Sequence, residues 1–353
     1  MSLGATGNPN PEANKNGLLA GSNLEKVLRA GHFAVTAELG PPQSADHLVI
    51  RNKARHLRDC CDGVNLTDNQ TAIVRMSSIA AGAILVQEGL EPIIQMVCRD
   101  RNRLAMQSDL MGAYALGIRN VLCLTGDHQS FGNHPTAKNV FDVDSCQLVK
   151  MVSGMRDQRV FQCGEAIKGQ EPRFFVGAAE SPFAAPVEFR PYRLGKKVKA
   201  GANFIQTQLV YDVPAFETFM EKVRTLGIHE QTSILVGVGP LKSPAMAKYM
   251  KESVPGILVP DELIQRMTKA GASWAGKKAD EMSKEEKKAR SEAWKAEGIK
   301  ICIELIHKVR AVPGVAGIHI MAIEWEEAVR PVVEGAGLLP RPNMHEPPRT
   351  DTD

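Results

Sequence analysis

The sequence predicts an α/β fold of the (β/α)8 (TIM) barrel type, and two observations support this fold class. Short apolar runs alternate with longer amphipathic segments, and the runs are continuous in hydrophobicity, as expected for strands buried on both faces. Polar residues also stand where several runs end: Glu38 closes the first, Asp127 follows the fourth, and Gln208 closes the sixth. In a closed parallel barrel all strand ends meet on one face, and that face carries the chemistry.

Eight strands are expected in order along the chain, each leading into helix. The expected strands are 33–38, 63–67, 92–97, 120–124, 173–178, 204–208, 233–238 and 315–321. The first of them ends in the rigid turn Gly40-Pro41-Pro42. An open doubly wound sheet is the competing fold, but it favours a GxGxxG turn after its first strand, and this turn does not match that pattern.

The segments between these strands are expected to be helical. The expected helices are 46–58, 73–88, 103–116, 144–155, 189–200, 215–226 and 244–252, then longer helical material over 260–312 and a last helix over 325–335. Gly117 and Gly201 each end a helix and lead into the next strand, which is a common C-terminal cap. Residues 279–297 are dense in Lys, Glu and Ala, so we expect a solvated helix with a structural role or a subunit contact.

Composition indicates one globular domain and excludes several classes of protein. The 353 residues fit one barrel with insertions, expected over 23–340. The tails 1–22 and 341–353 are rich in Gly, Asn or Pro, and we expect them to be disordered, the first without a signal peptide. The net charge of +3 argues against nucleic acid or an acidic membrane surface as partner. No apolar run is long enough for a spanning helix.

Seven cysteines without a CxxC pattern indicate reduced thiols in a cytoplasmic protein. His128 and His134 bracket a loop after Asp127, but their spacing fits no helical metal site. We therefore expect no metal, and a place near a ligand phosphate is the favoured interpretation for these histidines.

The three strand-end residues fit an active site, although each has a structural alternative. Burial beside apolar neighbours would raise the pKa of Glu38 and suit it to donate a proton, but it could also cap a helix or pair with arginine. Asp127 follows Gly126, where a flat ligand could approach the bare backbone, but it could be a helix N-cap. Gln208 could contact the edge of a heterocycle, or it could be a satisfied core amide.

At these residues the sequence resembles the methylenetetrahydrofolate reductase family. The resemblance spans roughly residues 25 to 340 and rests on four stretches in family order: Val35-Thr36-Ala37-Glu38-Leu39-Gly40-Pro41-Pro42, Leu124-Thr125-Gly126-Asp127, Lys197-Val198-Lys199-Ala200-Gly201-Ala202-Asn203-Phe204-Ile205-Gln206-Thr207-Gln208 and Gly314-Val315-Ala316-Gly317-Ile318-His319. Each stretch alone is weak evidence for the family, but four stretches in family order on an eightfold βα pattern are specific evidence for it.

The resemblance implies a flavin-bearing barrel that reduces 5,10-methylenetetrahydrofolate to 5-methyltetrahydrofolate in one-carbon metabolism. Glu38 matches the general acid, which helps to open the folate ring to an iminium cation. Asp127 matches an aspartate beside flavin and folate, whose charge stabilises that cation. Gln208 matches a glutamine that contacts the pterin.

The resemblance also implies a set of cofactor residues. FAD is favoured and FMN is possible. The residues expected at the cofactor are Thr125, Gly126, Asp127, His128, Gly177, Ala178, Lys197, Asn65 and Gln95. Within this set, Thr125 and Gly126 are expected along the flavin, Gly177 and Ala178 at a nearby strand end, and Lys197 at the phosphate or ribitol side.

Several departures from the family pattern concern the electron donor. Gln95 and Thr125 stand where the family often has His and Arg, Arg190 stands at an often acidic position, and residues 239–244 lack the Phe that stacks on NADH. These departures put direct use of NADH or NADPH in doubt and favour a partner subunit as donor. Without clustered cysteines this chain could not itself hold iron–sulfur clusters.

Two other functions remain open at this point. One is a non-redox pterin-binding barrel of a methyl-transfer system, and the other is a subunit of a larger electron-transfer complex that docks through residues 279–297. A homo-oligomer or hetero-oligomer is expected. Arg99, Arg101 and Arg103 could attract the carboxylates of a folate tail, or they could be solvated loop charges.

Overall fold

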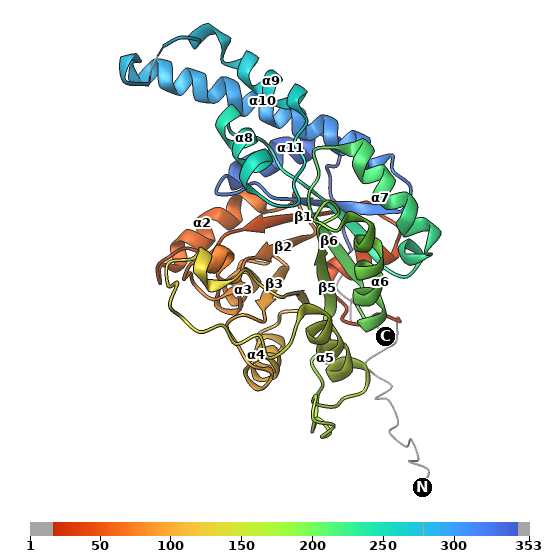
Figure 1. The fold of residues 1–353 in the computed structure, drawn as a ribbon. Coiled ribbons are helices and arrows are strands. Elements are labelled where there is room, and N and C mark those ends of the chain that lie inside the picture. The colour runs from red at the N-terminus through yellow and green to blue at the C-terminus, as the bar shows by residue number, and fades with distance from the viewer. Residues whose placement is uncertain (1–16, 278, 345–353) are drawn as a thin grey trace, which may run out of the picture.

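The computed structural model describes residues 17–277 and 279–344, which form a closed parallel barrel (Figure 1). Every strand pairs with the next one along the chain, and β8 pairs with β1, so the sheet has no free edge. The strands are β1 (Ala34–Leu39), β2 (Gly63–Leu66), β3 (Pro92–Val97), β4 (Asn120–Leu124), β5 (Phe175–Glu180), β6 (Phe204–Leu209), β7 (Ser233–Val238) and β8 (Val315–Ile320). The predicted (β/α)8 fold is confirmed.

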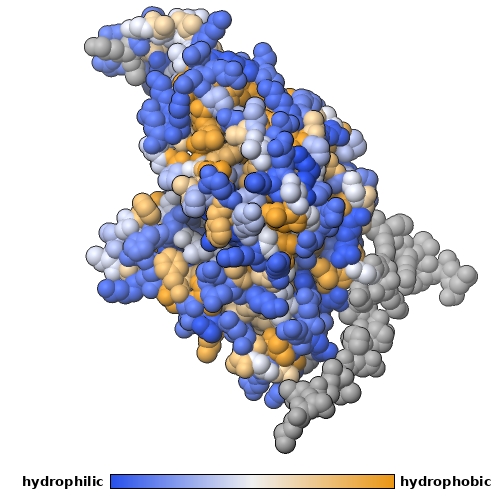
Figure 2. Space-filling view, turned by 45° about the vertical axis from the view of Figure 1, so that its right-hand side comes forward, coloured by the Kyte–Doolittle hydropathy of each residue, from blue (hydrophilic) through white to orange (hydrophobic). Residues whose placement is uncertain are grey.

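Helices surround the barrel, and the connection from β7 to β8 is the most elaborate one. The α-helices are α1 (Asn23–Arg29), α2 (His47–Leu57), α3 (Ser78–Gln87), α4 (Arg103–Ala115), α5 (Ser145–Asp157), α6 (Arg190–Ala200), α7 (Val213–Thr225), α8 (Pro244–Ser253), α9 (Asp261–Ala270), α10 (Lys284–Arg310) and α11 (Val329–Gly335). In Figure 1, α9 and the first part of α10 project from the barrel as an arm. Figure 2 shows a mostly hydrophilic surface on which apolar residues gather near the base of this arm.

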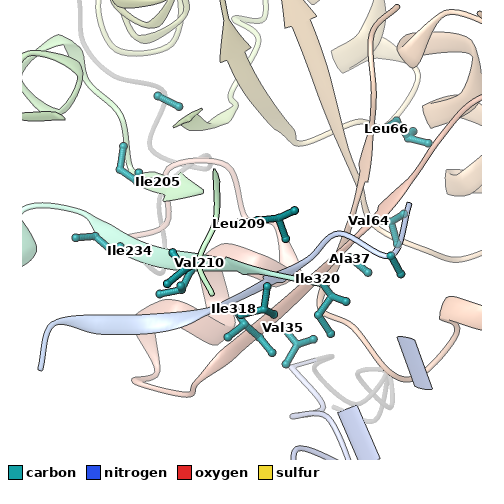
Figure 3. Packing of buried hydrophobic residues seen from close by; sticks show 14 of the residues in the cluster. Val35, Ala37, Val64, Leu66, Ile205, Leu209, Val210, Ile234, Ile318 and Ile320 are labelled. Atoms are coloured by element: carbon teal, nitrogen blue, oxygen red, sulfur yellow. The ribbon is translucent and has the colours of Figure 1, made fainter. Parts of the chain in front are cut away.

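The apolar residues of the strands alternate between two environments because successive side chains in a strand point to opposite faces. Val35 and Ala37 of β1 belong with Ile318 and Ile320 of β8 to the large core that lies between the strands and the helices (Figure 3). Thr36, between the first two, points to the barrel interior. Interior positions such as Ile93, Leu122 and Leu235 are apolar too, which explains why these strands appear in the sequence as unbroken apolar runs.

The amino-terminal end of the barrel is closed by α1, which the sequence did not predict. Leu24 and Val27 of this helix pack against interior side chains such as Phe175 and Phe204. The backbone N–H groups of Asn23 and Leu24 donate to the carboxylate of Glu91, which satisfies the start of the helix. A second apolar cluster therefore plugs the end of the barrel opposite to the strand termini.

A polar layer lies above this plug, in the middle of the barrel. The amides of Asn65 and Gln206 exchange two hydrogen bonds of 2.6 and 2.9 Å across the interior. Gln206 also donates to Thr36 Oγ1 at 3.1 Å, and that hydroxyl lies 3.0 Å from Nδ1 of His319. Burial lowers the pKa of His319 to about 3, so its ring is neutral. The layer is thus dry, neutral and internally satisfied.

The structure shifts several predicted strand ends by one residue and those of β5 by two, and it places parts of the predicted tails. The strand expected at 173–178 is β5, which begins and ends two residues later, at Phe175 and Glu180. Arg173, which precedes it, instead donates to the carbonyl oxygens of Leu18 and Leu19. Residues 17–22 and Arg341 therefore contact the barrel, whereas residues 1–16 and 345–353 of the predicted tails lie outside the described residues.

We predict that Gly177→Ala destabilises the barrel. A Cβ at Gly177 would lie 2.2 Å from the ring of Phe204, which is fully buried and stacked on Phe175. Overpacking of this kind costs about 1–3 kcal/mol, measured as a loss in the free energy of unfolding by denaturant. Gly112→Ala in α4 is the matched control, because a Cβ there meets nothing within 4 Å and favours the helix. Equal stability of both variants would show that the interior is not packed as described.

Candidate functional site

Glu38 and Gln208 stand at the same end of the barrel. Thr36 and Gln206 meet in the interior, and Glu38 and Gln208 stand two residues further along the same two strands. Because side chains alternate along a strand, Glu38 faces the interior above the polar layer, at the carboxyl end of the strands. The pairing of β6 with β7 shifts register between Gln206 and Leu209, so Gln208 is placed by a bulge at the same end, where it is half-buried. Gln208 Oε1 accepts the N–H of Leu209 at 3.0 Å, and its amide NH2 has no acceptor within the described residues.

Glu38 is the penultimate residue of β1 and is 9% exposed. Nothing in the described part of the chain donates a hydrogen bond to its carboxyl group. The pKa of Glu38 is raised to about 7, mainly by burial and also by the nearby carboxylate of Glu326, while Lys53 acts in the opposite direction. Lys53 Nζ lies 2.7 Å from Glu326 Oε1 and donates to the carbonyl of Gly40 at 3.1 Å. The direction of this shift is the one predicted, and near neutral pH the group exists in both protonation states.

Thr125, Gly126 and Asp127 follow the end of β4. Gly126 has φ +91°, and a Cβ there would lie 3.0 Å from Cβ of Val97, so glycine is needed for both backbone conformation and space. The hydroxyl of Thr125 accepts the N–H of Ser145, which ties this turn to the start of α5. Asp127 is exposed at the mouth of the barrel. It is not a helix N-cap, a position that His128 takes for the short helix Gln129–Phe131.

Arg99 holds the loop that carries Asp127. Its side chain is 3% exposed, and its guanidinium binds both carboxylate oxygens of Asp100 at 2.7 Å. The same group donates to the carbonyl oxygens of Asp127 and Asn69, each at 3.1 Å. A buried guanidinium with four such acceptors is well compensated. It links the loops that follow β2, β3 and β4.

The loop after β2 is strained and is pressed against the loop after β4. Asn69, Thr71 and Ala72 have φ of +44°, +54° and +58°, which only glycine adopts without cost. A Cβ at Gly132 would lie 1.8 Å from the carbonyl oxygen of Ala72, so the two loops meet without any side chain between them. Strain of this kind persists where the surroundings enforce it and is common at functional sites.

The other two arginines predicted for an anionic tail are also engaged. Arg101 binds Asp68 at 2.7 Å and Asp109 at 2.9 Å, and Arg103 binds Asp142 at 2.7 Å. Together with Arg99, all three arginines therefore have internal carboxylate partners. They are neither free to bind a ligand nor merely solvated.

Several residues predicted at the cofactor are packed or paired within the protein. Gly177 is in the packed interior beside Phe204, and Ala178 faces the outer core, because β5 runs two residues further than expected. Asn65 is bound within the polar layer. Lys197 is 5% exposed, and its Nζ lies 2.9 Å from Glu180 Oε2 and also donates to a β5 carbonyl. A ligand contact by Lys197 would require this buried pair to open.

Two residues that the sequence did not single out stand at the mouth. Thr67 follows β2 on the same face as Asn65, is 1% exposed, and its hydroxyl has no hydrogen-bond partner in the described structure. The hydroxyl of Ser181, just past β5, is likewise buried without a partner. Gln95, which was predicted, is half-buried on β3 and has no side-chain hydrogen bond within the described residues. The sequence does offer one signal that Thr67 lies at the mouth, because this residue directly follows an apolar run.

The remaining features of the described chain do not compete with this site. A pocket of about 600 Å³ lies between the end of α4 and residues 161–172, on the opposite side of the barrel. Within the residues described, no group of three His, Cys, Asp or Glu side chains could hold a metal ion. In the same ranges, none of the helices combines the length and apolar character that crossing a membrane needs.

Comparison with known proteins then gives the family. A family model described as methylenetetrahydrofolate reductase matches residues 23–337, which is nearly the whole barrel. The chain belongs to the methylenetetrahydrofolate reductase family. The resemblance inferred from the four sequence stretches is therefore confirmed.

Curated members of the methylenetetrahydrofolate reductase family resemble the chain over most of its length. The probable methylenetetrahydrofolate reductase (NADPH) of Caenorhabditis elegans is 23% identical over 76% of this chain and 36% of the relative. Methylenetetrahydrofolate reductase 2 of Schizosaccharomyces pombe is 26% identical over 70% and 36%. Methylenetetrahydrofolate reductase (NADH) 1 of Arabidopsis thaliana is 27% identical over 63% and 34%. The chain thus spans about a third of the length of these relatives.

A solved structure shares the fold of this family member. It is an uncharacterized protein from Clostridium thermocellum described as binding two copies of 5-methyl-5,6,7,8-tetrahydrofolic acid. The two superpose with a TM-score of 0.52 over 88% of this chain and 97% of that one, at 14% sequence identity. At this identity the likeness concerns the fold alone.

The mouth fits the flavin that the methylenetetrahydrofolate reductase family generally uses. Buried hydroxyls without partners at Thr67 and Ser181 could bind the polar edge of a ring system. The exposed side chains of Val74 and Phe131 stand on the loops after β2 and β4. Apolar surfaces with a few unsatisfied polar groups are typical of cofactor sites.

We predict that Glu38→Gln changes how stability depends on pH. The folded pKa of about 7 lies above the ordinary value of 4.5, so folding favours the protonated carboxyl group. The wild-type protein must then lose stability as pH rises from 5 to 8, on the order of 3 kcal/mol, while the neutral glutamine avoids this loss. Denaturant unfolding of both proteins at pH 5 and pH 8 measures it. An unchanged difference between the two proteins would mean that Glu38 ionises normally.

Proposed function

We propose that this chain reduces 5,10-methylenetetrahydrofolate to 5-methyltetrahydrofolate, with Glu38 as the proton donor. The observation that carries the proposal is the buried carboxyl group at the end of β1, whose pKa is raised to about 7 in a barrel of this family. A general acid works best when its pKa lies near the operating pH. When bound, the flavin would supply the hydride that reduces the folate carbon.

Glu38 would act on the nitrogen of the bridged folate ring. The bridging carbon joins two nitrogens, and Glu38 gives its proton to one of them. The bond from that nitrogen to the bridging carbon then breaks, and the carbon forms an iminium cation with the other nitrogen. Near Glu38, Lys53 and Glu326 form an ion pair with each other; the Glu326 carboxylate favours the protonated form of Glu38, and Lys53 opposes it. The buried position keeps the proton on the carboxyl group until the substrate nitrogen arrives.

Asp127 and Gln208 would position and stabilise the substrate. The carboxylate of Asp127 is exposed at the mouth, where its negative charge would favour a cation on the substrate. The amide NH2 of Gln208, which lacks an acceptor within the described residues, would bind an acceptor on the pterin edge. Thr125 and Gly126 would lie along the flavin. Arg99 fixes the Asp127 backbone for this task.

Several finer parts of the proposal rest on the family. FAD is favoured over FMN, and the donor is either NADH or NADPH or a partner subunit. Some relatives are named for NADPH and others for NADH. The oligomeric state and a cytoplasmic location stay predictions.

We expect Glu38→Gln to retain flavin but to lose folate reduction by several orders of magnitude, because the amide cannot donate the proton. The measurement is the single-turnover rate at which photoreduced enzyme is reoxidised by 5,10-methylenetetrahydrofolate. Glu327→Gln is the matched control, since this carboxylate follows Glu326 directly but is 62% exposed and weakly paired with His56. A Glu38→Gln rate near that of the control would exclude Glu38 as the acid.

The single-turnover rate of folate reduction should fall as pH rises. The proton donor is the protonated form of Glu38, which is lost as pH rises through about 7. We therefore expect the folate step to slow about tenfold per pH unit above that value. The residual rate of Glu38→Gln should lack this decline. A wild-type rate that is flat from pH 6 to 9 would contradict the assignment.

The non-redox pterin-binding barrel and the structural subunit of an electron-transfer complex remain the alternatives. Neither is favoured by a particular observation at the mouth. A protein that binds 5-methyltetrahydrofolate but cannot be loaded with flavin would support the first of them.

A further inference from the structure

Arg75 is held by a longer ion pair than four other cations near the mouth. Lys53, Arg99 and Arg101 each bind a carboxylate at 2.7 Å, and Lys197 binds one at 2.9 Å. Arg75, on the loop between β2 and α3, has its carboxylate partner at 3.7 Å, which is too long for a hydrogen bond. Its buried Nε has no partner within the described residues.

The position of Arg75 is nevertheless fixed. Its backbone N–H donates to Asn69 Oδ1 at 3.0 Å, and its Nη1 donates to the carbonyl of Pro41 at 3.1 Å. Pro41 lies three residues after Glu38, so the guanidinium stands beside the turn that follows the proposed proton donor. A fixed guanidinium with unused donors is preorganised to receive a carboxylate.

Glu324, the present partner of Arg75, is held weakly. Its side chain is 69% exposed, and its backbone has φ +48° in the loop after β8. Exposed ion pairs contribute little to stability, so displacing this carboxylate costs little. Lys242, after β7, donates to the carbonyl of the same residue at 3.2 Å and brings a second cation to this point.

We propose that Arg75, with Lys242 beside it, binds the glutamate carboxylate of the folate, and that the carboxylate of Glu324 occupies this subsite when folate is absent. The inference rests on the proposed function, since it takes folate to be the ligand. The p-aminobenzoyl group of folate separates the reacting carbon from the glutamate, so a carboxylate subsite belongs at the rim rather than beside Glu38. Arg99, Arg101 and Arg103, which the sequence offered for this role, are already paired.

The test compares two ligands that differ in the glutamate alone. We would measure the dissociation constants of 5-methyltetrahydrofolate and of 5-methyltetrahydropteroate, which lacks the glutamate, for the flavin-loaded protein. Arg75→Met should weaken the first ligand about 10- to 100-fold, the usual effect of losing a charged hydrogen bond, and change the second less than about twofold. Arg75→Lys should fall between Arg75→Met and wild type.

Glu324→Gln should change the affinity for 5-methyltetrahydrofolate in the opposite direction to Arg75→Met. If Glu324 competes with the substrate, removing its charge should tighten 5-methyltetrahydrofolate about two- to fivefold and leave the truncated ligand unchanged. A purely structural role of the Arg75–Glu324 contact cannot produce this gain. Arg103→Met is the control, because that arginine is paired with Asp142, and it should change neither constant.

Two outcomes would overturn the inference while the proposed function stands. In one, Arg75→Met weakens both ligands equally, which would mean that Arg75 only supports the loop. In the other, neither Arg75→Met nor Glu324→Gln alters the affinity for 5-methyltetrahydrofolate. If the wild-type protein binds neither ligand, the proposed function itself fails, and the subsite fails with it.

Discussion

The reciprocal amide pair of Asn65 and Gln206 is the interaction on which the geometry of the site depends. It joins β2 to β6 through the centre of the barrel, and the hydroxyl of Thr36 extends it to β1. Since side chains alternate along a strand, this pairing determines that Glu38, two positions after Thr36, faces the mouth, whereas Gln208 is placed by the bulge that follows Gln206 in β6. A slip of one residue in β1 would turn Glu38 into the outer core.

The polar layer also separates two regions with different tasks. Below it, α1 and the stacked rings of Phe175 and Phe204 fill the barrel with apolar side chains. Above it, Glu38 is buried without a hydrogen-bond donor among the described residues, and its raised pKa follows from that isolation. A charged layer beneath Glu38 would change its pKa. Burial keeps His319 neutral, so it does not supply a positive charge beneath the carboxyl group.

The loops above the barrel are held by a few buried contacts. Arg99 binds the backbone of both Asp127 and Asn69, and the contact between Gly132 and Ala72 leaves no freedom between the two loops. Local strain is tolerated there because the surroundings enforce it. Loops fixed in this way on a rigid barrel can present charges at defined places, which is what electrostatic catalysis requires.

The sequence predicts the barrel well because its strands are buried on both faces and therefore appear as continuous apolar runs. All eight strands were found, and β5 was misplaced by two residues because the apolar run continues past its expected end into Ala179. Helix α1 was missed, since its role is to cover the end of a barrel that exists only after the strands have closed.

The site was predicted in part, and the limits have physical causes. Glu38 and Gln208 were predicted together because strand ends converge in a barrel, and the structure places both at that end, while their roles stay predictions. Gly177 and Lys197 were expected at the cofactor, but their surroundings are set by Phe204 and Glu180, which the sequence alone does not bring next to them.

Paired arginines and unpartnered hydroxyls are also invisible in a sequence. Whether a charge such as Arg99 is free or engaged, and whether a hydroxyl such as that of Thr67 is satisfied, depends on loops far apart in the chain. These properties decide which polar groups are available to a ligand.

The most direct test of the account is the visible absorption spectrum of the purified protein, recorded anaerobically before and after addition of 5-methyltetrahydrofolate. The account predicts a yellow flavoprotein whose flavin absorption is bleached by this folate, because the proposed reaction runs in reverse when product is supplied. Addition of NADH to a separate oxidised sample would show whether the chain accepts electrons directly from NADH or needs a partner subunit. A colourless protein that cannot be loaded with flavin, or bound flavin that the folate leaves oxidised, would contradict the account.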